Sequence, residues 1–331
     1  MGSRVTLDDI ARAAGVSKYA VSRAISGKNG VSDATRERVL RLCDELGYIR
    51  HREKIDQTII MFTPKSEIDT AAFWMSVIQG IETEAARQKY CLNIKTVDGE
   101  IDDIELHSII SNAAGAIFVS HKTARLAQRV YQECPTLLLT YPLTPLLPVD
   151  SMTISDREAM EALSDKLIAW GHRHLAYYGP TERLFGKELI SGLQRSTEKM
   201  GVDPPEIWND LEKENVYQNT LEWLTYRKSQ NGFPSAILCA SDTLAQAVIF
   251  AINELSVRVP QEVSVTSFNS DTAMVPSIPV TSMGFDKFSY GAEAFRILHR
   301  RIVNPERPAC RIHFLQSFIV GSTAGAVSCN K

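Results

Sequence analysis

Short amphipathic segments separated by glycine open the chain. In the first segment, apolar residues recur at the spacing of one helix face, and they are Leu7, Ile10, Ala11 and Ala14. Gly15 follows at the point where a helix can end in a left-handed residue. The pattern therefore predicts a short helix that stops at Gly15.

A second helix is predicted to begin after Ser17, because serine is a favoured N-cap residue. Its apolar side carries Ala20, Val21, Ala24 and Ile25, and its polar side carries Lys18, Tyr19, Ser22 and Arg23. Residues 27–30 form the next break. Ser32 then caps a third segment whose apolar residues can cover the other two helices, namely Ala34, Val39, Leu42, Cys43 and Leu46.

Two short helices joined by a glycine turn, with a third as a brace, are typical of a helix-turn-helix unit. The alternative is a small helical cap with a solvated polar face. In a helix-turn-helix unit the second helix directs its N-terminal turn at base edges in the major groove. We therefore expect Lys18 and Tyr19 to read bases, and Arg23, one turn further on, to read a base or a phosphate. The hydroxyl-bearing residues that suit phosphate contacts are Thr6, Ser17, Ser22 and Thr35.

Apolar runs alternate with helical patterns after residue 57. The predicted strands are 58–62, 91–97, 115–120, 136–140, 174–178, 236–239 and 263–268. The predicted helices are 75–89, 104–112, 124–133, 159–170, 186–200, 217–227, 243–255 and 288–302. This alternation predicts an α/β fold with parallel sheets covered on both faces. So many strands exceed one sheet, so we expect two lobes with a cleft at the carboxyl ends of the strands.

Charge is distributed unevenly along the 331 residues. Residues 1–57 carry eleven Lys or Arg and eight Asp or Glu. The remainder carries 25 Lys or Arg and 31 Asp or Glu, and the whole chain has a net charge of −3. Because local charge governs phosphate attraction, an acidic remainder is compatible with a DNA-binding end. The chain shows no apolar run of about 18 residues and no secretory signal, which predicts a cytoplasmic protein without a membrane partner. The six scattered cysteines are expected to be reduced thiols.

A set of motifs near the N-terminus resembles the lactose/galactose repressor (LacI/GalR) family of bacterial transcription regulators. The matching motifs are Val5-Thr6-Leu7, Asp9-Ile10-Ala11, Ala14-Gly15-Val16-Ser17, Val21-Ser22-Arg23, Val31-Ser32, Thr35-Arg36 and Gly47-Tyr48-Ile49. Weaker matches continue through Gly80-Ile81-Glu82, residues 167–176, Cys239-Ala240-Ser241-Asp242 and residues 259–265. The DNA-binding candidates are thus Thr6, Ser17, Lys18, Tyr19, Ser22, Arg23, Thr35 and Tyr48.

The resemblance implies a homodimeric repressor of double-stranded operator DNA with a two-lobed, periplasmic-binding-protein-like core. In that fold the chain would cross between lobes near Ser155, Met283 and residue 313. It also implies a helix-turn-helix domain at 1–50, here called the head, a linker at 51–57, and a ligand-binding and dimerisation domain at 58–331. The linker is shorter than is usual in the family and lacks its Ala-rich hinge helix. A C-terminal Leu-rich heptad is also absent, which favours a dimer over a tetramer.

A small-molecule effector, expected to be a sugar or sugar derivative, is implied for the cleft. The candidate effector-binding residues are Phe73, Trp74, Arg183, Lys187, Asp242, Asn269 and Phe285. An aromatic ring at Phe73 or Trp74 could stack on a sugar or simply pack at a helix start. Lys187 is preferred to Arg183 as a ligand contact, and Asp242 could instead cap the helix that it opens. Asn269 replaces an aspartate that is common in the family, Ser155 replaces another, and Phe285 occupies a position that is often polar.

Catalytic and metal-binding patterns are not found. His172-x-His174 lacks the further ligands of a zinc site, and no phosphate-cradling glycine loop or nucleophile elbow is present. We therefore predict neither an enzyme nor a cofactor or metal. Two other functions remain open at this point. One is a cytoplasmic sugar-binding protein or sugar-processing enzyme with an incidental helical cap, and the other is an activator or ligand-independent regulator, suggested by the missing hinge helix.

Overall fold

The computed structural model describes residues 7–25, 31–46, 57–65, 71–97, 101–140, 147–209, 215–230, 232–271 and 279–327. The chain separates into two compact units, and the smaller one contains the helices of the head. Several predictions lie outside the described residues: those for Thr6 and Tyr48, the break at 27–30, and residues 51–56 of the linker.

The predicted helices of the head are confirmed as α1 (Leu7–Ala14), α2 (Lys18–Ile25) and α3 (Asp33–Glu45). Gly15 has a φ of +65°, which is the left-handed conformation that ends α1. The Ser17 hydroxyl accepts a hydrogen bond from the Ala20 N–H at 3.1 Å, and the Ser32 hydroxyl accepts one from the Thr35 N–H at 3.3 Å. Both serines therefore cap their helices as the sequence predicted.

The core of the head lies where the three helices meet. Ile10, Val21 and Val39 are fully buried there, one from each helix, together with Cys43. Two predicted core positions are wrong, because Ala34 is exposed and Leu46 keeps 42% of its surface exposed. Ala34 lies more than a third of a turn away from the face that Val39 defines, and Leu46 lies one residue beyond the end of α3.

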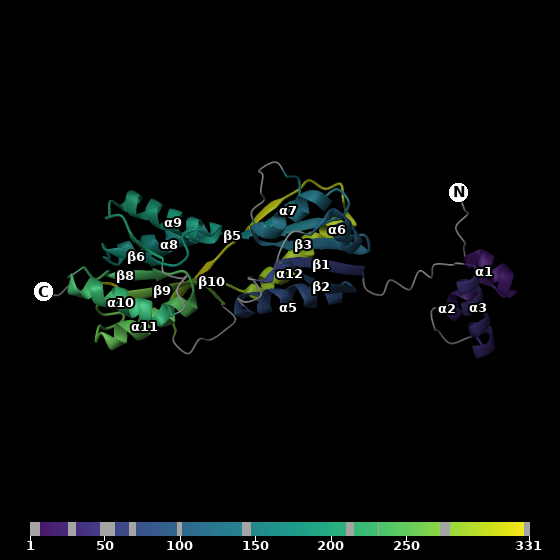
Figure 1. The fold of residues 1–331 in the computed structure, drawn as a ribbon, viewed down its shortest axis with the longest axis horizontal. Coiled ribbons are helices and arrows are strands. Elements are labelled where there is room, and N and C mark those ends of the chain that lie inside the picture. Colours follow the sequence, from purple (N-terminus) through teal and green to yellow (C-terminus); the bar gives the residue numbers. More distant parts are fainter. Residues whose placement is uncertain are drawn as a thin grey trace. The chain divides into compact units, whose positions relative to one another are not determined.

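The described strands of the larger unit form two sheets of six (Figure 1). The first has the order β11 (Arg311–Phe314), β5 (Asp150–Ile154), β4 (Thr136–Leu139), β3 (Ala113–Val119), β1 (Gln57–Pro64) and β2 (Tyr90–Val97). The second has the order β12 (Ser317–Ile319), β10 (Thr281–Phe285), β9 (Ser264–Asp271), β8 (Ala236–Cys239), β6 (Leu175–Tyr178) and β7 (Glu206–Trp208). The β3–β4–β5–β11 and β7–β6–β8–β9–β10 pairings are parallel, and β12 adds an antiparallel edge.

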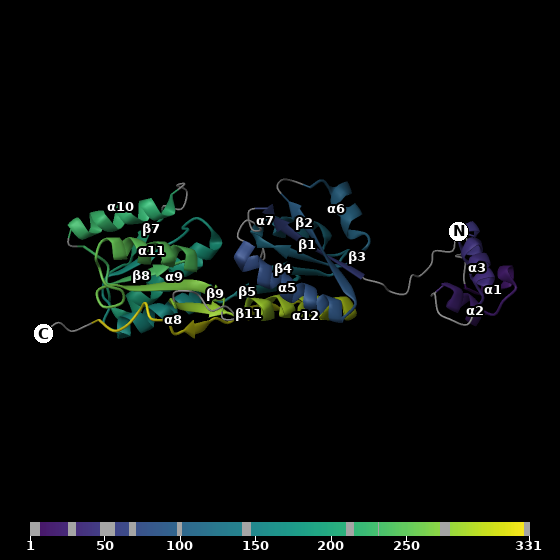
Figure 2. The ribbon, with the colours of Figure 1, turned by 90° about the horizontal axis from the view of Figure 1, so that it is seen from below.

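Helices cover both sheets, which confirms the predicted α/β class (Figure 2). The lobe of the first sheet carries α5 (Ala71–Arg87), α6 (Asp103–Ile110), α7 (Ser120–Val130) and α12 (Lys287–Val303). The lobe of the second carries α8 (Asp156–Ala169), α9 (Leu184–Met200), α10 (Val216–Ser229) and α11 (Asp242–Glu254). The sequence patterns missed β5, β7, β10, β11 and β12. Strands β5 and β10 are buried but rich in hydroxyl residues, so neither shows an uninterrupted apolar run.

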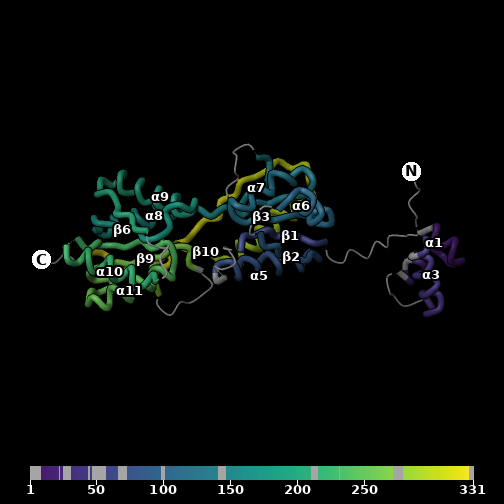
Figure 3. Tube along the Cα trace, in the orientation of Figure 1, coloured from purple at the N-terminus to yellow at the C-terminus, as the bar shows by residue number. Residues whose placement is uncertain are grey.

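The chain crosses between the two lobes at three places, all close to the predicted positions. The first is Ser155, between β5 and α8; the second is Asp286, between β10 and α12; and the third is the pair Leu315 and Gln316, between β11 and β12. Strands β5 and β11 pair in parallel, so the first and third crossings leave the first sheet side by side (Figure 3).

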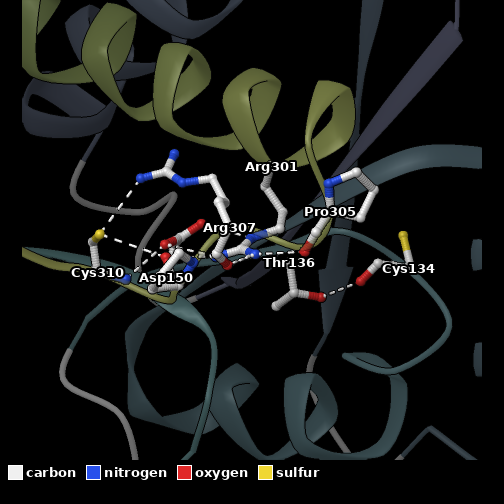
Figure 4. Close-up of polar contacts among 8 residues, drawn as sticks. Cys134, Thr136, Asp150, Arg301, Pro305, Arg307 and Cys310 are labelled. Atoms are coloured by element: carbon white, nitrogen blue, oxygen red, sulfur yellow. Dashed lines mark hydrogen bonds and ion pairs between the residues drawn. The ribbon is translucent and has the colours of Figure 1, made fainter.

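A buried ion pair fixes the far end of these two strands. Asp150, at the start of β5, is fully buried, and the Arg301 guanidinium donates to its two oxygens at 3.0 and 3.3 Å. The Cys310 N–H donates to the same carboxylate at 2.8 Å (Figure 4). The end of α12 and the starts of β5 and β11 are thereby joined, because a buried carboxylate requires such partners.

Candidate nucleic-acid interface and effector site

Helix α2 presents two different faces. Val21 and Ala24 are buried against the other helices of the head, whereas Lys18 is exposed and Tyr19 keeps 67% of its surface exposed. A ring so accessible lies outside the apolar core of the head. The structure thus places Lys18 and Tyr19 on the surface of the first turn of α2, the part of a recognition helix that meets base edges.

Tyr19 and Arg23 lie one turn apart on α2 and contact each other. The Arg23 guanidinium donates a hydrogen bond to the Tyr19 hydroxyl, and its Cζ atom lies 5.2 Å from the centre of the Tyr19 ring. This spacing is that of neighbours on one helix face. The two predicted contact residues are therefore brought together as a pair.

The predicted phosphate contacts are described only in part. The Ser17 hydroxyl caps α2, and the Thr35 hydroxyl lies 2.9 Å from the Ser32 hydroxyl that caps α3. A capping hydroxyl that accepts a hydrogen bond still has its own proton to donate, so the cap role is compatible with a phosphate contact. Ser22 lies within α2, and its side chain is outside the described part of the structure.

Phe285 ends β10 at the second crossing and is only 3% exposed. Its ring packs edge-on against those of Phe73, Tyr290 and Phe314, at centroid distances of 6.1, 5.5 and 5.8 Å. Trp74 packs edge-to-face against Phe73, with the ring centroids 5.0 Å apart. The aromatic residues therefore form one cluster across the crossings from α5, β10, α12 and β11.

Lys287 was missed by the sequence analysis. It is 7% exposed at the start of α12, and its ammonium lies 5.0 Å from the centre of the Phe73 ring. A cation over a ring face is stabilised by the ring quadrupole. The sequence around Lys287 contains three aromatic residues but does not predict this contact, because Phe73 is more than 200 residues away in the chain.

Arg183 and Lys187 are both exposed at the start of α9. The Lys187 ammonium lies 3.7 Å from the Glu182 carboxylate, and both side chains face solvent. Arg183 occupies the N-cap position of α9 without making a side-chain cap. The contacts described for these two basic residues therefore do not include the aromatic cluster.

Asp242 is not the helix cap, which corrects one of the two roles considered for it. Ser241 caps α11, because its hydroxyl accepts from the Leu244 N–H at 3.3 Å. The Asp242 carboxylate instead accepts hydrogen bonds from the Ser267 and Ser270 hydroxyls, at 2.5 and 2.6 Å. Asp242 therefore ties α11 to β9 and holds the strand end on which Asn269 lies.

Asn269 lies in β9 with a φ of +55°, next to a register shift in the pairing with β10. Its buried Oδ1 has no hydrogen-bond partner among the described residues. Ser120 directly follows β3 in the other lobe and has a φ of +68°. Its buried hydroxyl oxygen also has no hydrogen-bond partner among the described residues. Buried polar atoms are normally satisfied, so both oxygens are candidates for a ligand contact. Sequence reasoning missed Ser120 because nothing local marks a left-handed serine.

The first and third crossings also interact through Ser155, Asp156 and Gln316. The Gln316 amide donates to the Asp156 carboxyl at 2.9 Å, and the Gln316 N–H donates to the Ser155 hydroxyl at 3.3 Å. Burial, followed by the nearby carboxylates of Glu188 and Glu158, raises the pKa of Asp156 to about 8, although the Gln316 hydrogen bond opposes the shift. Asp156 is therefore a largely protonated acid at neutral pH.

Comparison with known proteins follows the same division of the chain. Residues 6–51 match the description "Bacterial regulatory proteins, lacI family", and residues 164–324 match "Periplasmic binding protein-like domain". The transcriptional regulator MalR of Streptomyces coelicolor is 28% identical over 97% of each chain. The transcriptional repressor PurR of Vibrio vulnificus is 28% identical over 91% of this chain and 93% of its own.

The N-terminal domain is a LacI-family DNA-binding domain. Among solved structures, the Lac repressor dimer bound to operator and the anti-inducer ONPF has a TM-score of 0.72 at 22% identity, over 98% of this chain and 100% of that one. A CelR–cellobiose complex has a TM-score of 0.65 at 22% identity, over 97% and 100%. The protein is a DNA-binding transcriptional regulator with a ligand-binding domain, and its relatives are regulators and not enzymes. No helix of the described ranges is long and apolar enough to cross a bilayer.

Two of the LacI-family motifs in the core have a packing explanation. At Gly80, on α5, an added Cβ would lie 2.0 Å from the Phe288 carbonyl oxygen of α12, so glycine permits the two helices to touch. His172 is buried, and its Nε2 lies 3.0 Å from the Gly325 carbonyl oxygen near the C-terminus. That contact gives His172 a structural role, and no metal-ligand group of three His, Cys, Asp or Glu occurs among the described side chains.

Proposed function

We propose that the chain is an operator-binding repressor that acts as a homodimer and presents two α2 helices to the half-sites of a near-palindromic operator. Lys18, Tyr19 and Arg23 are assigned to the side of α2 that reads bases, with Thr6, Ser17, Ser22 and Thr35 at the phosphates and Tyr48 as a further DNA contact. The observation that carries this assignment is the exposed polar face of α2, opposite its buried Val21 and Ala24. Such a regulator works in the cytoplasm, where its operator is.

The test is selection of duplexes from a random-sequence library by the full-length protein, followed by gel-shift titration at fixed salt. A two-fold symmetric consensus is expected. Replacing Lys18 and Tyr19 together by alanine should remove the preference for that consensus while leaving the melting temperature and the dimer intact, because neither side chain packs in the core. Enrichment of no sequence, even at low salt, would contradict the proposal.

The effector is proposed to be a sugar or sugar derivative bound between the lobes. Hydroxyl groups of a sugar are donors that could satisfy the buried oxygens of Asn269 and Ser120. The cluster around Phe73 offers ring faces of the kind on which sugars stack. Two proteins of similar fold are known in complex with cellobiose and with ribose, and those ligands belong to those proteins. Differential affinity of the effector for two lobe arrangements would then change operator affinity.

A thermal-shift screen of sugars and nucleobases, followed by operator titration with each hit, tests the effector proposal. Asn269→Leu should abolish the shift of a true hit, whereas Lys187→Met should leave it unchanged, because Lys187 faces solvent beside Glu182. A hit that is insensitive to Asn269→Leu would contradict the proposed site.

A second candidate function is a regulator that needs no effector. Phe285 is buried in the aromatic cluster and Asp242 is already bonded to two serines, so two of the predicted contacts are occupied by the protein itself. This candidate fails if any ligand alters operator affinity. The domain division at 1–50, 51–57 and 58–331 is retained as a proposal, and limited proteolysis is expected to cut first within 51–57.

A further inference from the structure

We propose that Tyr19 is a positioning residue for Arg23, holding its guanidinium for one guanine in each half-site, rather than an independent base reader. The inference rests on the proposed function, because it assumes that α2 enters the major groove. It assigns the sequence preference of the helix to Arg23 and Lys18, with Tyr19 acting through Arg23.

The geometry of the pair carries the inference. Tyr19 contacts Arg23 in two ways at once, through a hydrogen bond to its hydroxyl and through the ring, whose centre lies 5.2 Å from the Arg23 Cζ atom. The hydroxyl fixes one guanidinium nitrogen, and the ring face limits the positions of the whole group. A single contact would leave the arginine free to rotate, whereas the two together define its position.

The burial of the two side chains points the same way. Tyr19 is 67% exposed, yet Arg23, the longer and more polar residue, is only partly exposed on the same helix face. The opposite face of α2 is anchored by Val21 and Ala24, so the pair stands on a helix that is itself fixed in the head.

Guanine recognition suits a guanidinium held in this manner. Arginine binds the O6 and N7 atoms of guanine with two donors, which is the commonest specific contact in the major groove. The guanidinium has five N–H donors, so a bond to the Tyr19 hydroxyl is compatible with a two-donor contact to guanine. An arginine is rich in rotamers, so fixing it before DNA arrives reduces the entropy lost on binding. The expected benefit is about three- to ten-fold in affinity for the correct base pair.

The experiment compares five proteins on the operator consensus selected by the wild-type chain: wild type, Tyr19→Phe, Arg23→Ala, the double variant, and the matched control Tyr226→Phe. Tyr226 is an exposed tyrosine on α10, so its substitution removes the same hydroxyl group from a helix of the larger unit. Affinity is measured at constant salt for the consensus and for duplexes changed at one base pair at a time. The result is a specificity ratio for each position.

Arg23→Ala should flatten the guanine preference at one position of each half-site by at least about ten-fold. Tyr19→Phe should lower the ratio at that same position by about three- to ten-fold and leave other positions unchanged. In the Arg23→Ala background, Tyr19→Phe should have no further effect, and Tyr226→Phe should match the wild type. The absence of coupling in this cycle is the sign of two independent readers.

Three results would overturn the inference. Tyr19→Phe could change a base pair that Arg23→Ala leaves alone, which would make Tyr19 a reader in its own right. The two effects could multiply in the double variant. Tyr19→Phe could also bind more tightly, which would mean that the pair must break before DNA is read. If the wild-type chain selects no consensus, the proposed function fails first and the inference falls with it.

Discussion

Replacing Asp156 by asparagine should make the protein more stable at alkaline pH. Asp156 is buried at the first crossing and is faced by Glu158 of its own helix, by Glu188 of α9 and by the Gln316 amide. Burial, with the two carboxylates, raises its pKa from 3.8 to about 8. A folded pKa above the unfolded one favours the folded state most at low pH.

The sign and the size follow from linkage. Below about pH 4 the carboxyl is protonated in both states, and between about pH 4 and 8 the unfolded chain loses the proton that the folded chain keeps. Stability therefore falls across this window and stays low above it. Raising the pKa from 3.8 to about 8 corresponds to an upper limit of about 6 kcal/mol, and structural relaxation around the charge should reduce it to about 2 to 3 kcal/mol. Asparagine keeps an acceptor for Gln316 but never acquires the charge.

The assay is thermal unfolding of the full chain from pH 5 to pH 9. Asp156→Asn should melt only slightly above the wild type at pH 5, near the start of this window, and several degrees higher at pH 9. The matched control is Asp165→Asn. Burial opposes ionisation of Asp165, but the Lys199 and Ser196 hydrogen bonds outweigh it and lower its pKa, so this change should destabilise at neutral pH. Parallel pH profiles for the wild type and Asp156→Asn would refute the reasoning.

Three further changes test the packing of the larger unit. Gly80→Ala should lower the free energy of unfolding by about 1 to 3 kcal/mol, because its Cβ would meet the α12 backbone; an unchanged denaturation midpoint would contradict the close approach of the helices. Burial lowers the pKa of His172, so the folded protein favours the neutral imidazole. The contribution of this imidazole to stability is full above about pH 6.5 and is lost as the pH falls and the unfolded chain takes up the proton. The melting temperature of His172→Gln should therefore depend less on pH between pH 7 and 5 than that of the wild type. Arg301→Met should cost about 3 to 5 kcal/mol by leaving the Asp150 charge buried alone, and Asp150→Asn in addition should recover part of that loss in chemical denaturation; no recovery would mean that the pair is not the cause.

The head is the part of the chain that the sequence predicted almost completely. Each of its helices is bounded by local chemistry, such as the left-handed Gly15 and the capping Ser17, and a cap acts within three residues of itself. The sequence also predicted the alternation of strands and helices in the core, because buried parallel strands require apolar runs. The misplacement of Ala34 shows the limit of this reading, since a small apolar residue fits either face.

Tertiary structure alone decided the candidate effector site. Strand β10 shows no apolar run and becomes a strand only between β9 and β12. Gln316 donates a hydrogen bond to Asp156, which lies 160 residues earlier in the chain. Phe285 is buried against Phe73 and Phe314, which come from distant elements. Asp242 looks like a cap from its neighbours, yet it binds serines 25 and 28 residues away. Caps and periodicities operate within a turn or two of the chain, whereas the partners of a buried polar or aromatic side chain are chosen by the packing of whole elements.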